Sequence, residues 1–178
     1  MTDHELVRGC LEGKREAQRA LFRQYAGKML AICARYTESR AEAEDVMQEG
    51  FIKVFEKIHQ WQGSGPLGGW IRMVMVNTAL THIRSRRKWK DHTDLNAAEE
   101  LDAGDMNALS QMTVQELTDM ITRMPPGYRT VFNLFAIEGY GHKEIADALG
   151  ISENTSKTQF LKAKIWLKKT LETIERKH

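Results

Sequence analysis

One apolar segment of the sequence carries an aromatic, an amide, a hydroxyl and two cations on a single line. If residues 67–90 form one helix, the period of 3.6 residues brings five side chains within about 60° of each other: Trp70, Asn77, Thr81, Arg84 and Lys88. Together they could stack a base, hydrogen-bond to its edge and neutralise phosphates, which is the chemistry that binds single-stranded nucleic acid. Packing in a core explains Trp70 alone equally well.

The surroundings of this line favour the nucleic-acid interpretation. Residues 84–90 hold five positive charges in seven positions, a density typical of contact with a polyanion. The preceding loop, residues 62–69, contains four glycines, so a backbone could approach an extruded base closely there, although a plain connector is the alternative. Trp61 continues the apolar stripe of the preceding helix, which favours a core position for it.

A second set of polar side chains lies near the C-terminus. On a helix that begins after Ser152 and runs through Lys169, periodicity places five residues on the core side: Ser156, Phe160, Ala163, Leu167 and Leu171. The opposite side holds residues that could reach base edges and phosphates, and three further lysines add phosphate charge: Lys157, Thr158, Leu161 and Lys162, then Lys164, Lys168 and Lys169. A solvated lysine face on an ordinary helical hairpin is the alternative.

The residues before this helix predict how it is positioned. Residues 142–150 form a short helix with three inward side chains, Ile145, Ala146 and Leu149, and Gly150 stands where a helix end adopts the left-handed conformation. Ser152 or Thr155 can then cap the second helix. In this order of helix, tight turn and helix, the second helix can enter the major groove of DNA.

The rest of the chain is predicted to be all-α. Only three prolines occur, and no alternating run of β-branched residues appears. Helices are expected from Thr2 to about Gly13, over 17–36, from the cap Ser39 to Trp61, over 67–90, over 114–124 and over 128–137. Residues 91–112 are acidic and poor in large apolar side chains, which indicates a flexible linker between two small domains, 1–90 and 113–178.

An acidic cluster opens the helix that begins at Ser39, with Glu42, Glu44, Asp45, Gln48 and Glu49. A magnesium-dependent nuclease would need paired carboxylates, but these point to several sides of one helix. Surface charge matched to the helix dipole, or a docking site for a basic helix, is expected instead. No nucleophile set, phosphate-binding loop or zinc motif is present, so the sequence predicts no enzyme, no cofactor and no metal site.

The net charge of +2 conceals an uneven distribution. Residues 1–90 hold 16 basic and 10 acidic side chains, residues 91–122 hold none and 8, and residues 123–178 hold 10 and 6. Two basic blocks suited to a polyanion are therefore separated by an acidic segment. No run of about 18 apolar residues and no signal peptide is present, so we expect a cytoplasmic protein with no membrane insertion.

Several segments resemble a known family. Residues 43–61 resemble the helix by which sigma factors of the bacterial sigma-70 superfamily bind the clamp helices of RNA polymerase, and residues 66–89 resemble the −10-reading helix that follows it. Met-Pro-Pro-Gly-Tyr-Arg at 124–129, together with residues 138–146 and 149–159, resembles region 4 of the extracytoplasmic-function (ECF) group, which keeps only regions 2 and 4. The resemblance implies region 2 at 1–90, an acidic linker at 91–112 and a region 4 helix-turn-helix at 113–178.

The resemblance also implies roles for single residues. The contact with core polymerase is assigned to Asp45, Gln48, Glu49 and Phe51. The −10 DNA contact is assigned to Trp61, Gly65, Trp70, Asn77, Thr81, Arg84, Arg86, Arg87 and Lys88. The −35 contact is assigned to Lys157, Thr158, Leu161, Lys162 and Lys164. Relatives often carry arginine at positions 157 and 162, and lysine lacks the bidentate fork of arginine.

On this resemblance the protein binds core RNA polymerase, reads a −35 duplex, captures a −10 base and uses no cofactor. An anti-sigma factor is expected as a further partner, and the acidic linker is expected to follow the polymerase cleft toward the RNA exit channel. Two alternatives remain from the residues alone. One is a stand-alone helix-turn-helix regulator, which would bind DNA without polymerase, and the other is a small metal-dependent nuclease.

Overall fold

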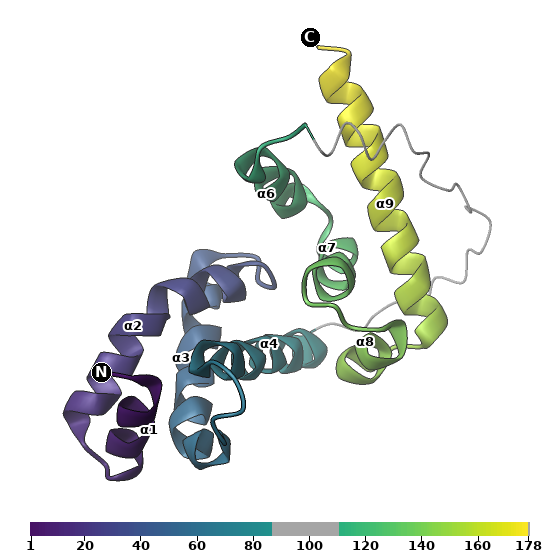
Figure 1. Ribbon diagram of the computed structural model, residues 1–178. Helices are drawn as coiled ribbons and strands as arrows, with labels where there is room; N and C mark the ends of the chain where they lie inside the picture. Colours follow the sequence, from purple (N-terminus) through teal and green to yellow (C-terminus); the bar gives the residue numbers. More distant parts are fainter. Residues whose placement is uncertain (87–110, 178) are drawn as a thin grey trace. The chain divides into compact units, whose positions relative to one another are not determined.

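The computed structural model of the protein describes residues 1–86 and 111–177 (Figure 1). The described residues form helices and connecting loops with no strand, which confirms the all-α prediction. Contacts divide the chain into two compact units, Met1–Arg87 and Lys88–His178. Residues 91–110 of the predicted acidic linker, together with Arg87 and Lys88, lie outside the described residues.

The first unit contains α1 (Asp3–Leu11), α2 (Arg15–Ala34), α3 (Arg40–Lys57), the short 3₁₀ turn η1 (Ile58–Gln60) and α4 (Leu67–Arg86). Thr2 and Ser39 begin two of these helices as predicted. The Thr2 side chain accepts a hydrogen bond from the Glu5 amide, and that of Ser39 accepts one from the Glu42 amide at 3.1 Å. Because these caps are local in sequence, the helix starts were readable without tertiary information.

The core of the first unit lies between α2, α3 and α4, which pack against each other. Its largest fully buried side chains include Leu21, Val46, Val54, Ile71 and Met75. Two glycines allow helices to approach closely. A Cβ at Gly9 would lie 2.5 Å from the Ala17 Cβ, and a Cβ at Gly50 would fall on the Met75 sulfur. The crossings of α1 with α2 and of α3 with α4 therefore depend on glycine.

The second unit contains α6 (Val114–Arg123), α7 (Pro126–Phe132), the π-helical turn η2 (Asn133–Ile137), α8 (His142–Leu149) and α9 (Glu153–Glu175). The core of α6 and α9 consists of Met120, Met124, Ala163, Leu167 and Leu171. The helix α9 ends six residues beyond the predicted Lys169. Val114 is the first residue of α6 and is 83% exposed.

The helices α8 and α9 form the predicted helix-turn-helix. Gly150 has φ 68° and ψ 36°, the left-handed conformation that glycine adopts without strain, and the Ile151 amide donates to the Ala146 carbonyl at 3.1 Å. Ser152 is the cap of α9, since its Oγ accepts from the Thr155 amide at 3.0 Å. No helix within residues 1–86 or 111–177 is long and apolar enough to span a bilayer.

Candidate nucleic-acid interface

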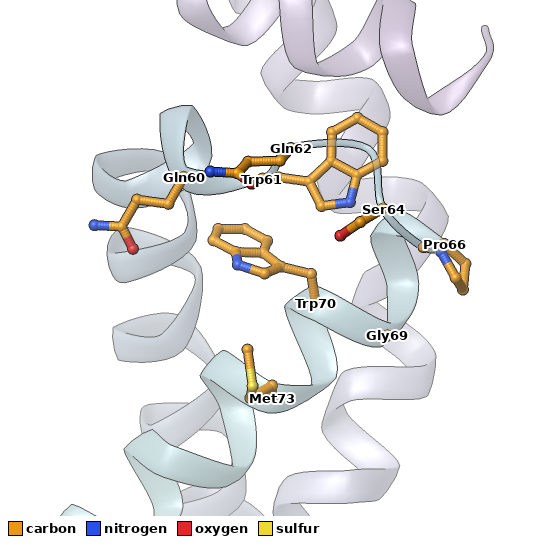
Figure 2. Close-up of a pocket in the computed structure, with 9 residues that line it drawn as sticks. Gln60, Trp61, Gln62, Ser64, Pro66, Gly69, Trp70 and Met73 are labelled. Carbon is orange, nitrogen blue, oxygen red and sulfur yellow. The ribbon is translucent and has the colours of Figure 1, made fainter.

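A cavity of about 320 Å³ opens between the loop after η1 and the first turns of α4. Figure 2 shows the indole rings of Trp61 and Trp70 turned toward this space, with Met73 one turn further along α4. Its remaining walls come from the loop and the start of α4: Gln60, Gln62, Ser64, Gly65, Pro66 and Gly69. We call this cavity the tryptophan pocket. Two aromatic faces beside amide and hydroxyl groups can stack a planar base and hydrogen-bond to its edge.

Trp61 and Trp70 are both half-buried. The core position favoured for Trp61 by its apolar stripe is therefore only partly correct. The helix α3 ends at Lys57, and the 3₁₀ turn and loop that follow carry Trp61 out of register with the stripe. His4 of α1 supports the outer side of Trp61, with ring centroids 4.9 Å apart and an edge-to-face angle of 60°. Sequence periodicity missed His4 because it lies on a different helix.

A carboxylate on α1 holds the start of α4 next to the tryptophan pocket. The Leu67 amide donates to Oδ2 of Asp3 at 3.1 Å, and the Tyr25 hydroxyl donates to Oδ1 of the same side chain at 3.1 Å. Gly63 has φ 73°, and a Cβ there would lie 3.1 Å from Nε2 of His4, so the loop bends where only glycine fits easily. Residues near the N-terminus thus set the shape of a pocket formed sixty residues later.

The polar line along α4 is exposed. Asn77, Thr81 and Arg84 are all accessible, and the Thr81 hydroxyl donates to the Asn77 carbonyl at 3.0 Å. Together with the half-buried Trp70, they form a surface running away from the tryptophan pocket. Lys88, the last member of the predicted line, lies outside the described residues.

Arg86 lies on a different side of α4 from this surface, and its assignment to the −10 contact stays a prediction. Its Nη1 donates to Oε1 of Glu42 at 3.0 Å, and Nε2 of His82 lies 2.7 Å from the same oxygen. Arg86 is two residues from Arg84, a rotation of about 200° on the helix, so it faces α3. The cluster of Glu42, His82 and Arg86 instead ties the end of α4 to the start of α3.

The acidic face of α3 is partly as predicted. Asp45, Gln48 and Glu49 are exposed, and Glu49 forms an ion pair with Lys53 at 2.9 Å. Phe51, assigned to the same contact, is only 3% exposed. It packs on Phe22 and Phe55, with ring centroids 4.7 and 6.3 Å away, so the structure makes it a support of this helix instead of a surface group.

Ile52 is the member of the acidic face that the sequence analysis missed. It is 59% exposed and follows Asp45 and Gln48 at spacings of seven and four residues, which places all three on one side of α3. An exposed isoleucine could form the apolar centre of a protein contact, with the polar side chains at its rim. Within residues 1–86 and 111–177, no group of three or more His, Cys, Asp or Glu side chains is arranged to hold a metal ion.

The start of α9 presents a smaller polar face than periodicity predicted. Lys157 is exposed and lies 3.5 Å from Glu153, while Leu161 and Lys162 are half-buried. Thr158 is 8% exposed, so the expected accessible position was wrong for this residue.

The error at Thr158 arose because α9 buries a second side. In addition to the predicted Ser156 and Ala163, Thr155 and Gln159 are buried, and polar residues give no apolar stripe to reveal this. The exposed Asn154, missed by the sequence analysis, shares the side of α9 that carries Lys157 and Leu161. Asparagine can form two hydrogen bonds with N6 and N7 of adenine in the major groove, so Asn154 could serve as a base-reading group on this face.

Aromatic groups of η2, α8 and α9 pack against each other within the second unit. His142 stacks on Phe135 with centroids 4.5 Å apart, and its Nδ1 lies 2.8 Å from Oγ of Ser156. Burial lowers the pKa of His142, and the charge of Lys157 acts in the same direction. The ammonium of Lys164 lies 5.3 Å from the centre of the Phe160 ring, which makes a cation–π contact.

Two family models match the sequence of this chain. The family model described as Sigma-70 region 2 matches residues 21–89, and the model described as Sigma-70, region 4 matches residues 114–167. The chain belongs to the sigma-70 family, in its ECF group. The first match covers the tryptophan pocket and the acidic face, and the second covers the helix-turn-helix.

Curated relatives are similar over nearly their full length. The ECF RNA polymerase sigma-E factor of Haemophilus influenzae is 26% identical over 175 residues, which cover 92% of each chain. The RNA polymerase sigma-H factor of Pseudomonas aeruginosa is 26% identical over 186 residues, covering 98% of this chain and 96% of the relative. The solved structure of CnrH in complex with the cytosolic domain of CnrY has the same fold, with a TM-score of 0.50, 18% identity and coverage of 96% and 97%.

Membership in the family establishes the general function. Sigma factors bind core RNA polymerase and promoter DNA and direct promoter-dependent initiation of transcription. They are initiation factors and leave phosphodiester chemistry to the polymerase.

Proposed function

We propose that this sigma factor captures one unpaired base of the −10 element in the tryptophan pocket while the start of α9 reads the −35 duplex. The observation that carries the proposal is the pairing of Trp61 and Trp70 around one cavity, at the head of the exposed line formed by Asn77, Thr81 and Arg84. The indoles supply stacking, the amide and hydroxyl supply hydrogen bonds, and the cation neutralises phosphate.

The free-energy cost of extruding a base and the gain from stacking it on indoles are of similar size. Taking a base out of the duplex stack costs a few kcal/mol per step. Stacking on an aromatic side chain returns about 1–3 kcal/mol per base, so a pocket with two indoles can offset the cost of one extruded base. No ATP is then required, because binding energy and the contacts of the polymerase drive the opening of the duplex.

For the −35 element, α9 enters the major groove through its first turns. The exposed Asn154 and Lys157 share one side of α9 with the half-buried Leu161, and Lys162 adds charge at its edge. Asparagine reads adenine, an apolar side chain contacts the thymine methyl, and lysine binds guanine or phosphate without the bidentate geometry of arginine. Thr158 takes no part unless the bound state exposes it.

The polymerase contact is the acidic face of α3, formed by Asp45, Gln48, Glu49 and Ile52. Exposed carboxylates around an isoleucine suit a basic helix with an apolar centre. Phe51 supports this face from the core.

An anti-sigma factor is proposed as the inhibitor of the free protein. The supporting observation is the complex of the structurally similar CnrH with the cytosolic domain of CnrY. We also propose that the protein acts in the cytoplasm, because its partners core polymerase and promoter DNA are found there.

The deciding experiment for base capture is run-off transcription with purified core polymerase on a randomised promoter library. The wild-type protein should yield promoter-dependent transcripts. Trp70→Ala should weaken binding of a preopened −10 template by about 5- to 150-fold, which is the loss of 1–3 kcal/mol of stacking. Trp70→Phe should restore most of this affinity. If Trp70→Ala binds as well as the wild type, the tryptophan pocket does not capture a base.

The polymerase contact is tested by charge reversal. Glu49→Lys should weaken binding to core polymerase, while Glu16→Lys, an exposed reversal on α2, should leave it unchanged. Binding of the free chain to a −35 duplex should be equal for both variants. If the Glu49→Lys variant bound core polymerase with the wild-type affinity, the assignment of the polymerase contact to α3 would be wrong. A stand-alone regulator would instead protect its site from cleavage without any polymerase.

A further inference from the structure

The helix α1 contacts both elements that form the walls of the tryptophan pocket. Trp61 lies in the loop after η1, and Trp70 lies in the first turn of α4 (Figure 2). Neither element alone fixes how far apart the two indoles stand. Asp3 and His4, adjacent residues at the start of α1, each contact one of these two elements. They are about 100° apart around the helix, so their side chains reach different neighbours.

Asp3 supplies a cap that the residue before α4 cannot provide. That residue is Pro66, whose ring has no hydrogen-bond acceptor. The Leu67 amide, one of the unpaired donors at a helix start, donates instead to Oδ2 of Asp3 at 3.1 Å. The carboxylate charge is also favourable at the positive end of the helix dipole. Within the same turn the Trp70 amide donates to the Pro66 carbonyl at 3.4 Å, so this cap also fixes the backbone that carries the Trp70 indole.

The Asp3 carboxylate is itself held by α2. The Tyr25 hydroxyl donates to Oδ1 of Asp3 at 3.1 Å. Burial raises the pKa of Tyr25, and the hydrogen bond to Asp3 acts in the same direction, so this hydroxyl stays a donor. Gly9 also lets α1 cross α2 at close range beside Ala17. The position of Asp3 is therefore set by contacts outside the tryptophan pocket.

His4 supports the other wall. Its ring meets Trp61 edge to face, and a Cβ at Gly63 would lie 3.1 Å from its Nε2, so the imidazole lies against the loop as well as the indole. Among the described residues that line the tryptophan pocket, His4 is absent. It can therefore act on a bound base only through Trp61.

The separation of the two indoles matters because dispersion contacts are short-ranged. A base that touches a ring on each face needs the rings about 7–8 Å apart, twice the usual contact distance between carbon atoms. A gap of about 0.5–1 Å on one side already loses a quarter to a half of that contact. Walls held at the right separation before binding also lose less side-chain freedom when a base enters.

We infer that Asp3 and His4 are positioning residues for capture of the −10 base, because they hold Trp70 and Trp61 at the separation that one base requires. This inference rests on the proposed capture of a −10 base. It gives α1 a function in promoter opening in addition to its packing in region 2.

The test uses holoenzyme and single-stranded oligonucleotides that carry the −10 strand of a promoter obtained by run-off selection. In a series of these strands each −10 position in turn is made abasic, and the captured base is the one whose removal weakens wild-type binding most. The ratio of Kd for that abasic strand to Kd for the intact strand measures the contribution of the base alone. For the wild type it should be about 5- to 150-fold.

His4→Ala should reduce this ratio by about 2- to 12-fold, which is the loss of one edge-to-face aromatic pair. His4→Phe keeps a ring beside Trp61 and should retain the wild-type ratio. Arg8→Ala, a change at an exposed position of the same helix, should also leave the ratio unchanged.

Asp3→Ala should reduce the ratio by a similar factor, because it removes the acceptor of the Leu67 amide. Asp3→Asn should restore much of the ratio, since its amide oxygen can accept from Leu67 while its NH₂ group donates to the Tyr25 hydroxyl. Thermal unfolding of each variant checks that region 2 is folded at the temperature of the assay.

The outcomes separate this inference from the proposed function. If Trp70→Ala lowers the ratio but the alanine variants of Asp3 and His4 do not, the inference is wrong and base capture stands. Equal weakening of the intact and abasic strands by these variants, at an unchanged ratio, would make α1 a support of the fold only and would also overturn the inference. A His4→Phe protein as impaired as His4→Ala would exclude the ring contact as the cause. If no abasic position weakens wild-type binding, base capture itself fails and the inference fails with it.

Discussion

Replacing Gly9 with alanine should destabilise region 2, although the same substitution usually stabilises a helix. The new Cβ would lie 2.5 Å from the Ala17 Cβ, whereas carbon atoms in contact prefer about 3.5–4.0 Å. Both atoms are held by backbone, so α1 and α2 must separate by about 1 Å. Overpacking of this kind costs about 1–3 kcal/mol and exceeds the helix-propensity gain of at most about 1 kcal/mol.

Gly27→Ala is the matched control on α2. No atom lies within 4 Å of a Cβ at Gly27, so only the propensity gain remains and region 2 should become more stable by up to about 1 kcal/mol. For a domain of this size, 1 kcal/mol corresponds to a change in Tm of about 4–8 °C. The two variants should therefore shift the Tm of region 2 in opposite directions.

The assay is calorimetric unfolding of the full chain, fitted with separate transitions for the two units. Fluorescence in a Trp166→Phe background assigns the transition of region 2, because the other described tryptophans, Trp61 and Trp70, lie in that unit. A Gly9→Ala protein as stable as the wild type would refute the packing argument. A destabilised Gly27→Ala protein would contradict the open space around a Cβ at Gly27.

Three further predictions concern single side chains. Gly150→Ala should destabilise region 4 by about 1 kcal/mol, because φ is 68° there, and should weaken binding to a −35 duplex in a mobility-shift titration. The pKa of His142 is lowered by burial, so the unfolded chain binds its proton more readily and region 4 should lose stability as the pH falls below about 6.5, measured by hydrogen exchange of α8 amides. Asp3→Ala should leave the Leu67 amide without its acceptor and lower the Tm of region 2, as seen by calorimetry.

The helices and their ends could be predicted from the sequence because their causes are local. The caps at Thr2, Ser39 and Ser152 bind amides three residues ahead, and Gly150 needs only its own conformational freedom. Apolar stripes likewise depend on spacings of three and four residues. The all-α fold and the helix-turn-helix are therefore properties of short windows of sequence.

Positions opposite an apolar stripe were less predictable. Phe51 and Ile52 are neighbours of similar hydrophobicity, yet one is buried and the other exposed, since only one faces α2 and α4. Thr158 was misplaced because a helix can bury a polar side that periodicity does not mark. Arg86 and Arg84 belong to one run of cations but face different sides of α4, because a helix turns through 100° per residue.

By itself the sequence determined which residues are helical, where the helices begin and which side chains could serve a base, a phosphate or a polymerase. Only the tertiary structure decided that Trp61 and Trp70 share one cavity, that Asp3 holds the start of α4, and that His4 supports Trp61. The physical reason is one of range. Caps and periodicity act within one helical turn, whereas a pocket depends on how closely separate helices cross, and here that closeness is decided by contacts such as Gly9 with Ala17 and Gly68 with Tyr25.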